Sequence, residues 1–204
     1  MSKTNNETLD SYNKRVLEYV KTSPQKVGDQ LGVWIDKILS KLNTNARILE
    51  IGSGSGKDDD YFKSKGFHME LTDGSQGFVD YLISKGKQAR LLNILTDELG
   101  DCYQLVFADA VFLHFTSEEL KAILSKIYKS LIDRGTVAFT LKAGNGEEMT
   151  DRKIDARRYF RYWSADLIRD LLKNIGYENI QIYTIGDYRG EAKMDWLLIS
   201  VDKM

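Results

Sequence analysis

The segment that most constrains the fold is "ARILEIGSGSGKDDDYF", residues 46–62, in which a short apolar run ends in glycines at alternate positions: Gly52, Gly54 and Gly56. A nearly continuous apolar run of this length is typical of a strand buried on both faces. Glycines directly after it let the main chain turn sharply and approach a ligand closely. The amides that open the following helix bind polar or anionic groups. The segment therefore predicts a strand–loop–helix unit that holds a ligand.

Strands and helices alternate through the rest of the chain. We expect helices over 75–86, 117–132 and 164–176, the last two capped by Ser117 and Ser164 and stopped by Gly135 and Gly176. Further strands are expected at 67–72, 88–94, 103–108, 136–141, 178–185 and 195–201, of which the last two have no helix between them and should pair antiparallel. This order predicts an α/β fold, doubly wound and Rossmann-like, with a mostly parallel seven-stranded sheet and an antiparallel last strand.

The N-terminal part differs from this pattern. Apolar stripes predict two helices, roughly residues 9–21 and 29–42, separated by the single proline, Pro24. With 204 residues the chain is expected to be one domain, made of an N-terminal helical cap (1–45) and an α/β core (46–204).

Composition narrows the classes of function. The formal net charge is -1, which gives no general reason to expect a nucleic-acid or membrane partner. The single cysteine, Cys102, excludes an internal disulfide and favours a reducing compartment. The polar start of the sequence resembles no secretory signal, and we expect a cytoplasmic, soluble protein. Two histidines and one cysteine lie far apart, so no metal site is expected.

The glycine spacing bears on which ligand binds. A P-loop motif is absent, and Lys57 stands where the third glycine of a dinucleotide-binding fingerprint would fall. Acids at 58–60 would repel a pyrophosphate but not a cofactor with a sulfonium and an ammonium group. Asp73 ends the second expected strand, where an acid accepts hydrogen bonds from ribose hydroxyls in such folds. Taken alone, Asp73 could simply be a turn residue. Taken together with the glycine loop, Asp73 favours a nucleoside-containing ligand.

The order of these motifs resembles a class I S-adenosylmethionine-dependent methyltransferase of the small bacterial single-domain type. The resemblance covers roughly residues 46–201 and rests on the segments "ILEIGSGSG", "ELTDGS", "LVFADAVFLHF", "RGTVAFTLKAGNGEE" and "RYFRYWSADLIRDLLKNIGY". The resemblance implies that the cofactor is S-adenosylmethionine and that the substrate is a small molecule. It also places the N-terminal helices where such enzymes cap their cofactor.

The resemblance assigns cofactor contacts residue by residue. Gly52, Ser53 and Gly54 would line the methionine part, and Glu50 and Asp58 would help to hold its amino group. Asp73 would bind the ribose, and the remaining residues would contact the adenine or the sulfonium: Gly74, Ser75, Asn93, Ile94, Ala108 and Asp109. The chain departs from the family at Asn93, where many members have an acid, although an amide oxygen can still accept the adenine hydrogen bond.

Methyl transfer from a sulfonium is an in-line displacement, which needs a base only when the nucleophile arrives protonated. His114, in "FLHF", is the candidate catalytic base; the alternative is a packed histidine that supports its loop. His68 lies at the far end of its strand from the expected site.

The segment 151–163, "DRKIDARRYFRYW", interleaves basic and aromatic residues. Such a pattern can bind single-stranded nucleic acid, but in a chain of nearly neutral charge we favour a lid over a small substrate. Arg157 or Arg158 would then recognise an anionic substrate group. The other expected substrate contacts are Tyr12 and Tyr19 from the cap, with Lys142 and Tyr162 on the lid side.

Three alternatives stay open from the sequence. The chain could be an RNA- or protein-directed methyltransferase, a binding protein that holds the cofactor without transfer, or, more distantly, a Rossmann oxidoreductase. Base methylation by the known proline-containing loops is disfavoured because Pro24 is the only proline. The acceptor, its nucleophilic atom and the oligomeric state are not encoded in a recognisable pattern.

Overall fold

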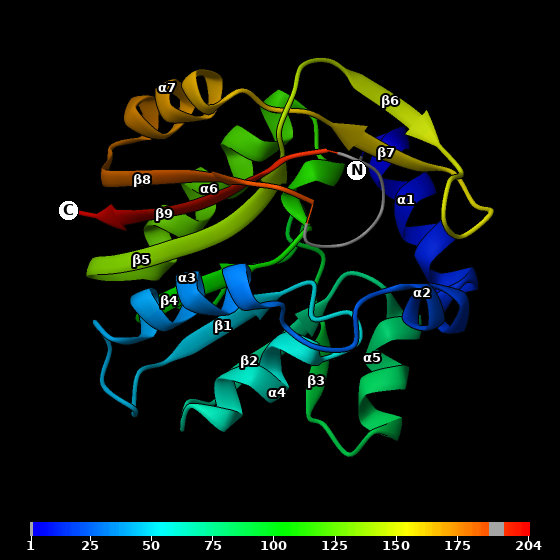
Figure 1. Ribbon diagram of the computed structural model, residues 1–204, viewed down its shortest axis with the longest axis horizontal. Helices are drawn as coiled ribbons and strands as arrows, with labels where there is room; N and C mark the ends of the chain where they lie inside the picture. The colour runs from blue at the N-terminus through cyan, green and yellow to red at the C-terminus, as the bar shows by residue number, and fades with distance from the viewer. Residues whose placement is uncertain (1, 188–193) are drawn as a thin grey trace.

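The computed structural model describes residues 2–187 and 194–204. Figure 1 labels its elements along the chain. The helices are α1 (Lys3–Lys14), α2 (Val16–Thr22), α3 (Asp29–Leu39), α4 (Lys57–Ser64), α5 (Gln76–Ser84), the short 3-10 helix η1 (Phe112–His114), α6 (Ser117–Ser130) and α7 (Ala165–Ile175). The strands are β1 (Ile48–Ile51), β2 (Met69–Asp73), β3 (Ala89–Leu91), β4 (Tyr103–Ala108), β5 (Leu131–Lys142), β6 (Glu147–Thr150), β7 (Arg158–Arg161), β8 (Tyr177–Ile185) and β9 (Trp196–Lys203).

The main sheet has seven strands in the order β3-β2-β1-β4-β5-β9-β8. Pairings from β3 to β5 are parallel, whereas β9 runs antiparallel to both β5 and β8. The predicted doubly wound sheet with an antiparallel last strand is therefore confirmed. Strand order reverses between β1 and β4, and in such sheets ligands bind beyond the carboxyl ends of the strands at this switch point. The glycine loop leaves β1 at this position.

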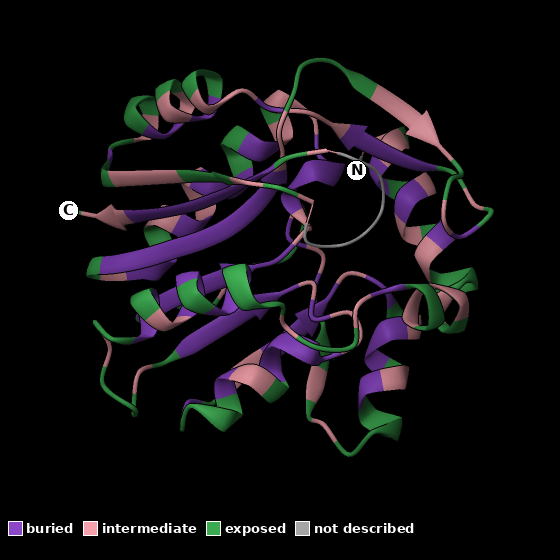
Figure 2. Ribbon diagram, viewed as in Figure 1, coloured by how far each residue is buried: buried purple, intermediate pink, exposed green. Residues whose placement is uncertain are grey.

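Helices cover both faces of the sheet, and alternate strand residues point to the two sides. Leu49 and Val106 pack into one cluster with α6 and α7, whereas Ile48 and Phe107 pack into another with α3 and α4. Figure 2 shows the resulting buried strands between helices with exposed outer faces. Burial on both faces explains why β1 and β4 read as continuous apolar runs.

Several boundaries differ from the expectation. The helix expected over 9–21 is two helices, α1 and α2, and it breaks at Arg15, whose φ of -125° is not helical. Helix α6 is capped by Thr116 rather than Ser117, in a reciprocal capping box with Glu119. Gly135 does not stop a helix: it lies inside β5, where an added Cβ would sit 2.9 Å from the Tyr103 carbonyl oxygen.

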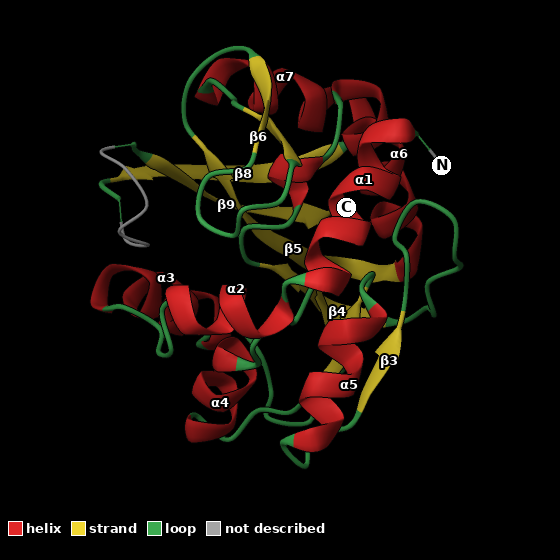
Figure 3. Cartoon of the chain, turned by 90° about the vertical axis from the view of Figure 1, so that its right-hand side faces the viewer, coloured by secondary structure: helices red, strands yellow, loops and turns green. Residues whose placement is uncertain are grey.

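The basic and aromatic segment expected as a lid contributes to a two-stranded antiparallel hairpin, β6–β7, outside the main sheet. Helix α1 lies between this hairpin and α5, as Figures 1 and 3 show. The amide of Tyr159 in β7 donates to Thr8 Oγ1 (3.0 Å), and Ser11 Oγ donates to the Arg157 carbonyl (2.6 Å). The N-terminal cap and the hairpin are thus joined directly.

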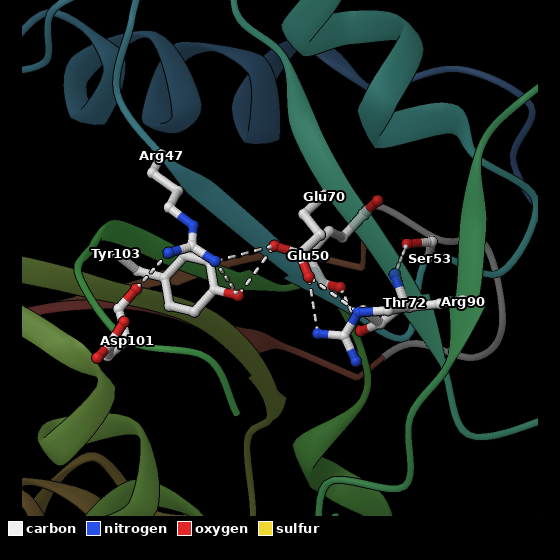
Figure 4. Close-up of polar contacts among 8 residues, drawn as sticks. All are labelled: Arg47, Glu50, Ser53, Glu70, Thr72, Arg90, Asp101 and Tyr103. Atoms are coloured by element: carbon white, nitrogen blue, oxygen red, sulfur yellow. Dashed lines mark hydrogen bonds and ion pairs between the residues drawn. The ribbon is translucent and has the colours of Figure 1, made fainter. Parts of the chain in front are cut away.

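Polar contacts fix the strands at both ends of β1 and β2 (Figure 4). At the amino ends, the Arg47 guanidinium lies 4.5 Å from the centre of the Tyr103 ring and pairs with Glu70, which Arg90 also contacts at 2.7 Å. At the carboxyl ends, Thr72 Oγ1 donates to the Glu50 carbonyl (2.6 Å). Within the described ranges, no helix is long and apolar enough to cross a membrane.

Candidate active site

The glycine loop adopts a backbone that side chains rarely allow. Gly52, Gly54 and Gly56 have φ values of 72°, 50° and 81°. The loop is anchored to the next strand, because the amide of Ser53 donates to the Thr72 carbonyl (2.9 Å) and the amide of Gly54 donates to Asp73 Oδ2 (3.0 Å). Gly52 and Gly54 line a cavity at the end of β1, whereas Gly56 packs against Leu82 and Lys87.

Replacing Gly52 by alanine should damage this loop. An added Cβ would lie 2.4 Å from Val111 Cγ2, at a φ that disfavours any side chain. We expect Gly52→Ala to lower the melting temperature and to weaken nucleoside binding at least about tenfold, since strained backbone and steric overlap together cost about 1–3 kcal/mol or more. Thermal unfolding and calorimetry with S-adenosylhomocysteine test this; Gly66→Ala, also at positive φ but with open space around its Cβ, is the control.

Asp73 lies at the centre of the site. Its carboxylate accepts hydrogen bonds from the amides of Gly54 (3.0 Å) and Ser75 (2.9 Å), and the residue is only 7% exposed. Burial raises its pKa to about 6, while the two backbone hydrogen bonds oppose that shift. Each carboxylate oxygen can accept more than one hydrogen bond, so Asp73 keeps the capacity to bind a ligand hydroxyl.

A buried ion cluster connects the glycine loop to the end of β4. Lys57 Nζ donates to Asp58 Oδ1 (2.6 Å) and Asp109 Oδ2 (2.8 Å), and Thr140 Oγ1 donates to Asp109 Oδ1 (2.7 Å). The side chains of Lys57, Asp58 and Asp109 are all less than a tenth exposed. Lys57, which stands where a dinucleotide-binding fingerprint would have its third glycine, therefore pairs with both Asp58 and Asp109 and offsets one of their two negative charges.

Glu50 is buried beneath the loop rather than in the cavity wall, with 1% exposure. Its pKa is raised well above the usual value, first by burial and then by the nearby charge of Asp58. Its Oε2 has no hydrogen-bond partner among the described residues. A cationic group brought near this carboxyl would lower its pKa and could donate a hydrogen bond to Oε2.

The N-terminal cap closes the cavity in front of the loop. The Asn13 side-chain oxygen accepts from Ser75 Oγ (2.7 Å) and from the amide of Gly77 (3.0 Å), which docks α1 on the start of α5. The cap contributes apolar and aromatic walls as well as buried polar residues. The cavity residues from the cap and α5 are Asn5, Thr8, Leu9, Tyr12, Tyr19 and Phe78.

His114 lies in the same cavity, and hydrogen bonds define its tautomer. Its Nδ1 is 2.6 Å from the carbonyl oxygen of Tyr159, which can only accept, so Nδ1 carries the proton. Nε2 is 2.8 Å from the Tyr12 hydroxyl and accepts its proton, and Arg158 Nη1 donates to the same hydroxyl at 3.2 Å. The unprotonated ring nitrogen therefore faces the cap.

The structure brings most of the predicted site residues together. The cavity is lined by Gly52, Gly54, Asp73, Gly74, Asn93, Ile94, Asp109 and His114, together with Tyr12 and Tyr19. Ser75 lies just behind Asp73, and Ala108 and Ser53 are buried next to the wall. The Asn93 amide oxygen already accepts from the amide of Leu95 (3.0 Å), and its amide nitrogen lies 3.3 Å from Asn5 Oδ1.

The substrate residues divide into two groups. Lys142, Arg158 and Tyr162 line a second cavity, between β5, the hairpin and the start of β9. Arg157 lines neither cavity; its side chain is 63% exposed and lies 3.7 Å from Glu7. Of the two arginines considered from the sequence, Arg158 is therefore the one in a position to meet a bound molecule.

Sequence reasoning missed several residues of the site. Asn5 and Thr8 line the first cavity, and with Ser11 they form a polar yet buried face of α1 at helical spacing. A search for apolar stripes does not detect such a face. A regular spacing of small polar residues was the available signal. Phe160 and Trp196 were not singled out because aromatic residues are so often part of a core.

Comparison with known proteins agrees with this geometry. A family model described as a methyltransferase domain matches residues 25–182. A curated relative, the phosphoethanolamine N-methyltransferase of Plasmodium falciparum, is 26% identical over 164 residues. That match takes in 74% of this chain and 62% of the relative, so this chain spans less than two thirds of that protein's length.

Solved structures of low sequence identity share the fold. A methyltransferase from Methanosarcina mazei matches with a TM-score of 0.71 and 13% identity, over 82% of this chain and 97% of that one. The 1,6-didemethyltoxoflavin N1-methyltransferase of Burkholderia thailandensis, solved with its substrate and S-adenosylhomocysteine, matches with a TM-score of 0.68 and 14% identity, over 100% and 92%. The chain therefore belongs to the methyltransferase-domain family and shares the fold of these solved methyltransferases.

Proposed function

We propose that this protein transfers the methyl group of S-adenosylmethionine to a small-molecule acceptor by in-line displacement. One observation carries the proposal: the cavity lined by Gly52, Gly54 and Asp73 is also lined by Tyr12 and His114. The residues proposed to bind the nucleoside thus line the same cavity as a histidine whose Nε2 contacts the Tyr12 hydroxyl.

The residues of the cavity suit the cofactor. Asp73 would accept hydrogen bonds from the ribose hydroxyls, and Gly74, Asn93 and Ile94 would surround the adenine. Glu50, whose buried Oε2 is without a partner among the described residues, would stabilise the cationic amino group from beneath the loop, together with Asp58. When bound, the cofactor supplies a methyl group already activated by a positively charged sulfur.

The chain's contribution to the chemistry would be alignment, exclusion of water and removal of a proton. His114 is held by the Tyr159 carbonyl so that Nε2 faces the cavity. An acceptor that arrives protonated would give its proton to this nitrogen, either directly or through the Tyr12 hydroxyl. The aromatic contacts of His114 with Tyr12 and Phe160, at ring-centre distances of 5.4 Å and 4.6 Å, keep the imidazole in place.

Cofactor binding should depend on pH through Asp73. Its pKa of about 6 lies above the ordinary value of 3.8, so it loses its charge in mildly acidic solution. We expect the dissociation constant of S-adenosylhomocysteine to rise about threefold to tenfold between neutral pH and pH 5, because a protonated carboxyl is a weaker acceptor for ribose hydroxyls. Calorimetry across this range tests the effect, and Asp73→Asn should bind weakly with a flatter profile.

The stability of the free protein should change in the opposite direction. Because the native pKa is raised, Asp73 contributes stability that is fully present below pH 3.8 and is lost as pH rises through about 6. Cofactor affinity and intrinsic stability therefore respond oppositely to the same ionisation. Weaker binding at pH 5 that is caused by protonation of Asp73 can therefore be distinguished from weaker binding that is caused by acid unfolding of the protein.

A small acceptor is favoured over RNA because most basic side chains of 151–163 are paired with carboxylates or buried. Little unpaired positive charge is therefore exposed for an RNA backbone. Arg152 pairs with Glu148, Arg161 Nη1 pairs with Glu147 (3.0 Å), and Arg158 is only 3% exposed. Much of the positive charge is thus neutralised or buried within the hairpin. The N-methyltransferases of similar sequence or fold described above also carry names of small-molecule acceptors.

Calorimetry and a transfer assay test the proposal together. S-adenosylmethionine and S-adenosylhomocysteine should bind with micromolar dissociation constants, whereas NADH should not bind. A screen with methyl-labelled cofactor should then find label on small amines, alcohols or thiols but not on RNA or protein. Binding of NADH in place of the adenosyl compounds, or label only on RNA, would contradict it.

A further inference from the structure

The second cavity adjoins the first and is built for a different chemistry. Its volume is about 250 Å³, which suits a small metabolite. Lys142 Nζ lies 4.4 Å from the centre of the Phe160 ring and 5.6 Å from a ring of Trp196, so the wall combines cations with aromatic faces. In the described part of the chain, four cationic side chains and two carboxylates line this cavity: Lys142, Arg152, Lys153, Arg158, Glu148 and Asp187.

Arg158 is the unusual member of this set. It is 3% exposed, and among the described residues its hydrogen-bond partners are the Tyr12 hydroxyl and the Arg152 carbonyl, neither of which carries a negative charge. Its Nε has no hydrogen-bond partner among the residues described. A buried guanidinium is costly unless an anion and its remaining hydrogen bonds are supplied. The geometry of a guanidinium suits a carboxylate or a phosphate group that presents two oxygens.

The same residue connects the two cavities. Arg158 Nη1 donates to the Tyr12 hydroxyl, and Tyr12 in turn hydrogen-bonds His114 Nε2. Phe160 lies between the cavities as well, because its ring packs on His114 in the first and lines the second. A molecule held by Arg158 would therefore have its far end close to His114.

We propose that the acceptor carries an anionic group, a phosphate or a carboxylate, which binds Arg158 in the second cavity and directs the nucleophile past Tyr12 toward His114. The inference rests on the proposed function, because it identifies that cavity as the acceptor subsite. It names the class of substrate: a small anionic molecule with an amine, hydroxyl or thiol a few bonds from its charge. Lys142 and Phe160 form the wall beside the anion.

Titration of anions into the protein saturated with S-adenosylhomocysteine tests this proposal. Inorganic phosphate and acetate serve as the two probes, and they distinguish a phosphate site from a carboxylate site. At least one should bind with a millimolar or tighter dissociation constant. Arg158→Gln should weaken that binding at least about tenfold, since a charged bidentate partner is lost. Arg157→Gln, the same change at the exposed neighbour, should stay within about twofold.

The affinity for S-adenosylhomocysteine separates this inference from the proposed function. If both variants bind it as the unaltered protein does, the cofactor site is intact and any loss of anion binding belongs to the second cavity. If neither anion binds the unaltered protein, or if both bind Arg158→Gln equally well, the proposal is wrong. If Arg158→Gln does not fold, a crystal of the unaltered protein soaked in phosphate decides: the anion should lie within hydrogen-bond distance of Arg158 Nε, and an anion bound only elsewhere overturns the proposal.

Discussion

Asp73→Ala should abolish measurable cofactor binding. The substitution removes the acceptor proposed for two ribose hydroxyls, and it also removes the group that orders the amides of Gly54 and Ser75. Hydrogen bonds to a charged group contribute about 1.5–3 kcal/mol each, so two of them correspond to a loss of affinity of at least about 100-fold. Calorimetry with S-adenosylhomocysteine measures the effect directly.

A matched control separates this role from a general effect of removing an acid. Asp80 lies on the same segment, is exposed, and its carboxylate hydrogen-bonds Gln76. Asp80→Ala should bind the cofactor as the unaltered protein does. An Asp73→Ala protein that folds and keeps its affinity within about threefold would show that the ribose does not bind there.

His114→Ala should lower kcat without lowering cofactor affinity. Loss of a positioned general base reduces rates by about 100-fold to 10,000-fold. The cofactor contacts are proposed on other residues, so the dissociation constant of S-adenosylhomocysteine should change little. The measurement is steady-state kinetics with the acceptor found in the transfer screen, across a range of pH.

The other histidine gives the control for this experiment. His68 is exposed and lies just before β2, at the end of the sheet away from the site. His68→Ala should retain full activity. Tyr12→Phe, which removes the hydroxyl that contacts His114 Nε2, should reduce kcat less than His114→Ala does. Unchanged turnover in His114→Ala would identify His114 as a packed residue that supports its loop.

The strand–helix order and the sheet topology could be predicted because strands that are buried on both faces, such as β1 and β4, consist of nearly continuous apolar runs. The residues at which helices and strands begin and end were harder to predict. Helix α6 passes directly into β5 at Leu131, without the glycine stop that Gly135 suggested. The short strands β6 (Glu147–Thr150) and β7 (Arg158–Arg161) lack the alternating apolar pattern that would predict a strand, and β7 also hydrogen-bonds the cap through the amide of Tyr159.

The cofactor side of the site was predictable to a similar extent. Gly52, Gly54 and Asp73 follow strands at fixed positions of a doubly wound sheet, so their meeting is a consequence of the topology. The link from Arg158 through Tyr12 to His114 joins segments 146 and 102 residues apart in the sequence. No spacing rule encodes such contacts; they follow from how α1 and the hairpin pack together.

A crystal structure with S-adenosylhomocysteine tests the central claim most directly. We expect the nucleoside to lie in the cavity beneath α1, with the ribose hydroxyls within hydrogen-bond distance of the Asp73 carboxylate. The sulfur should then lie on the side of the cavity that holds Tyr12 and His114. A ligand bound away from the glycine loop, or with its sulfur directed away from His114, would contradict the proposed reaction.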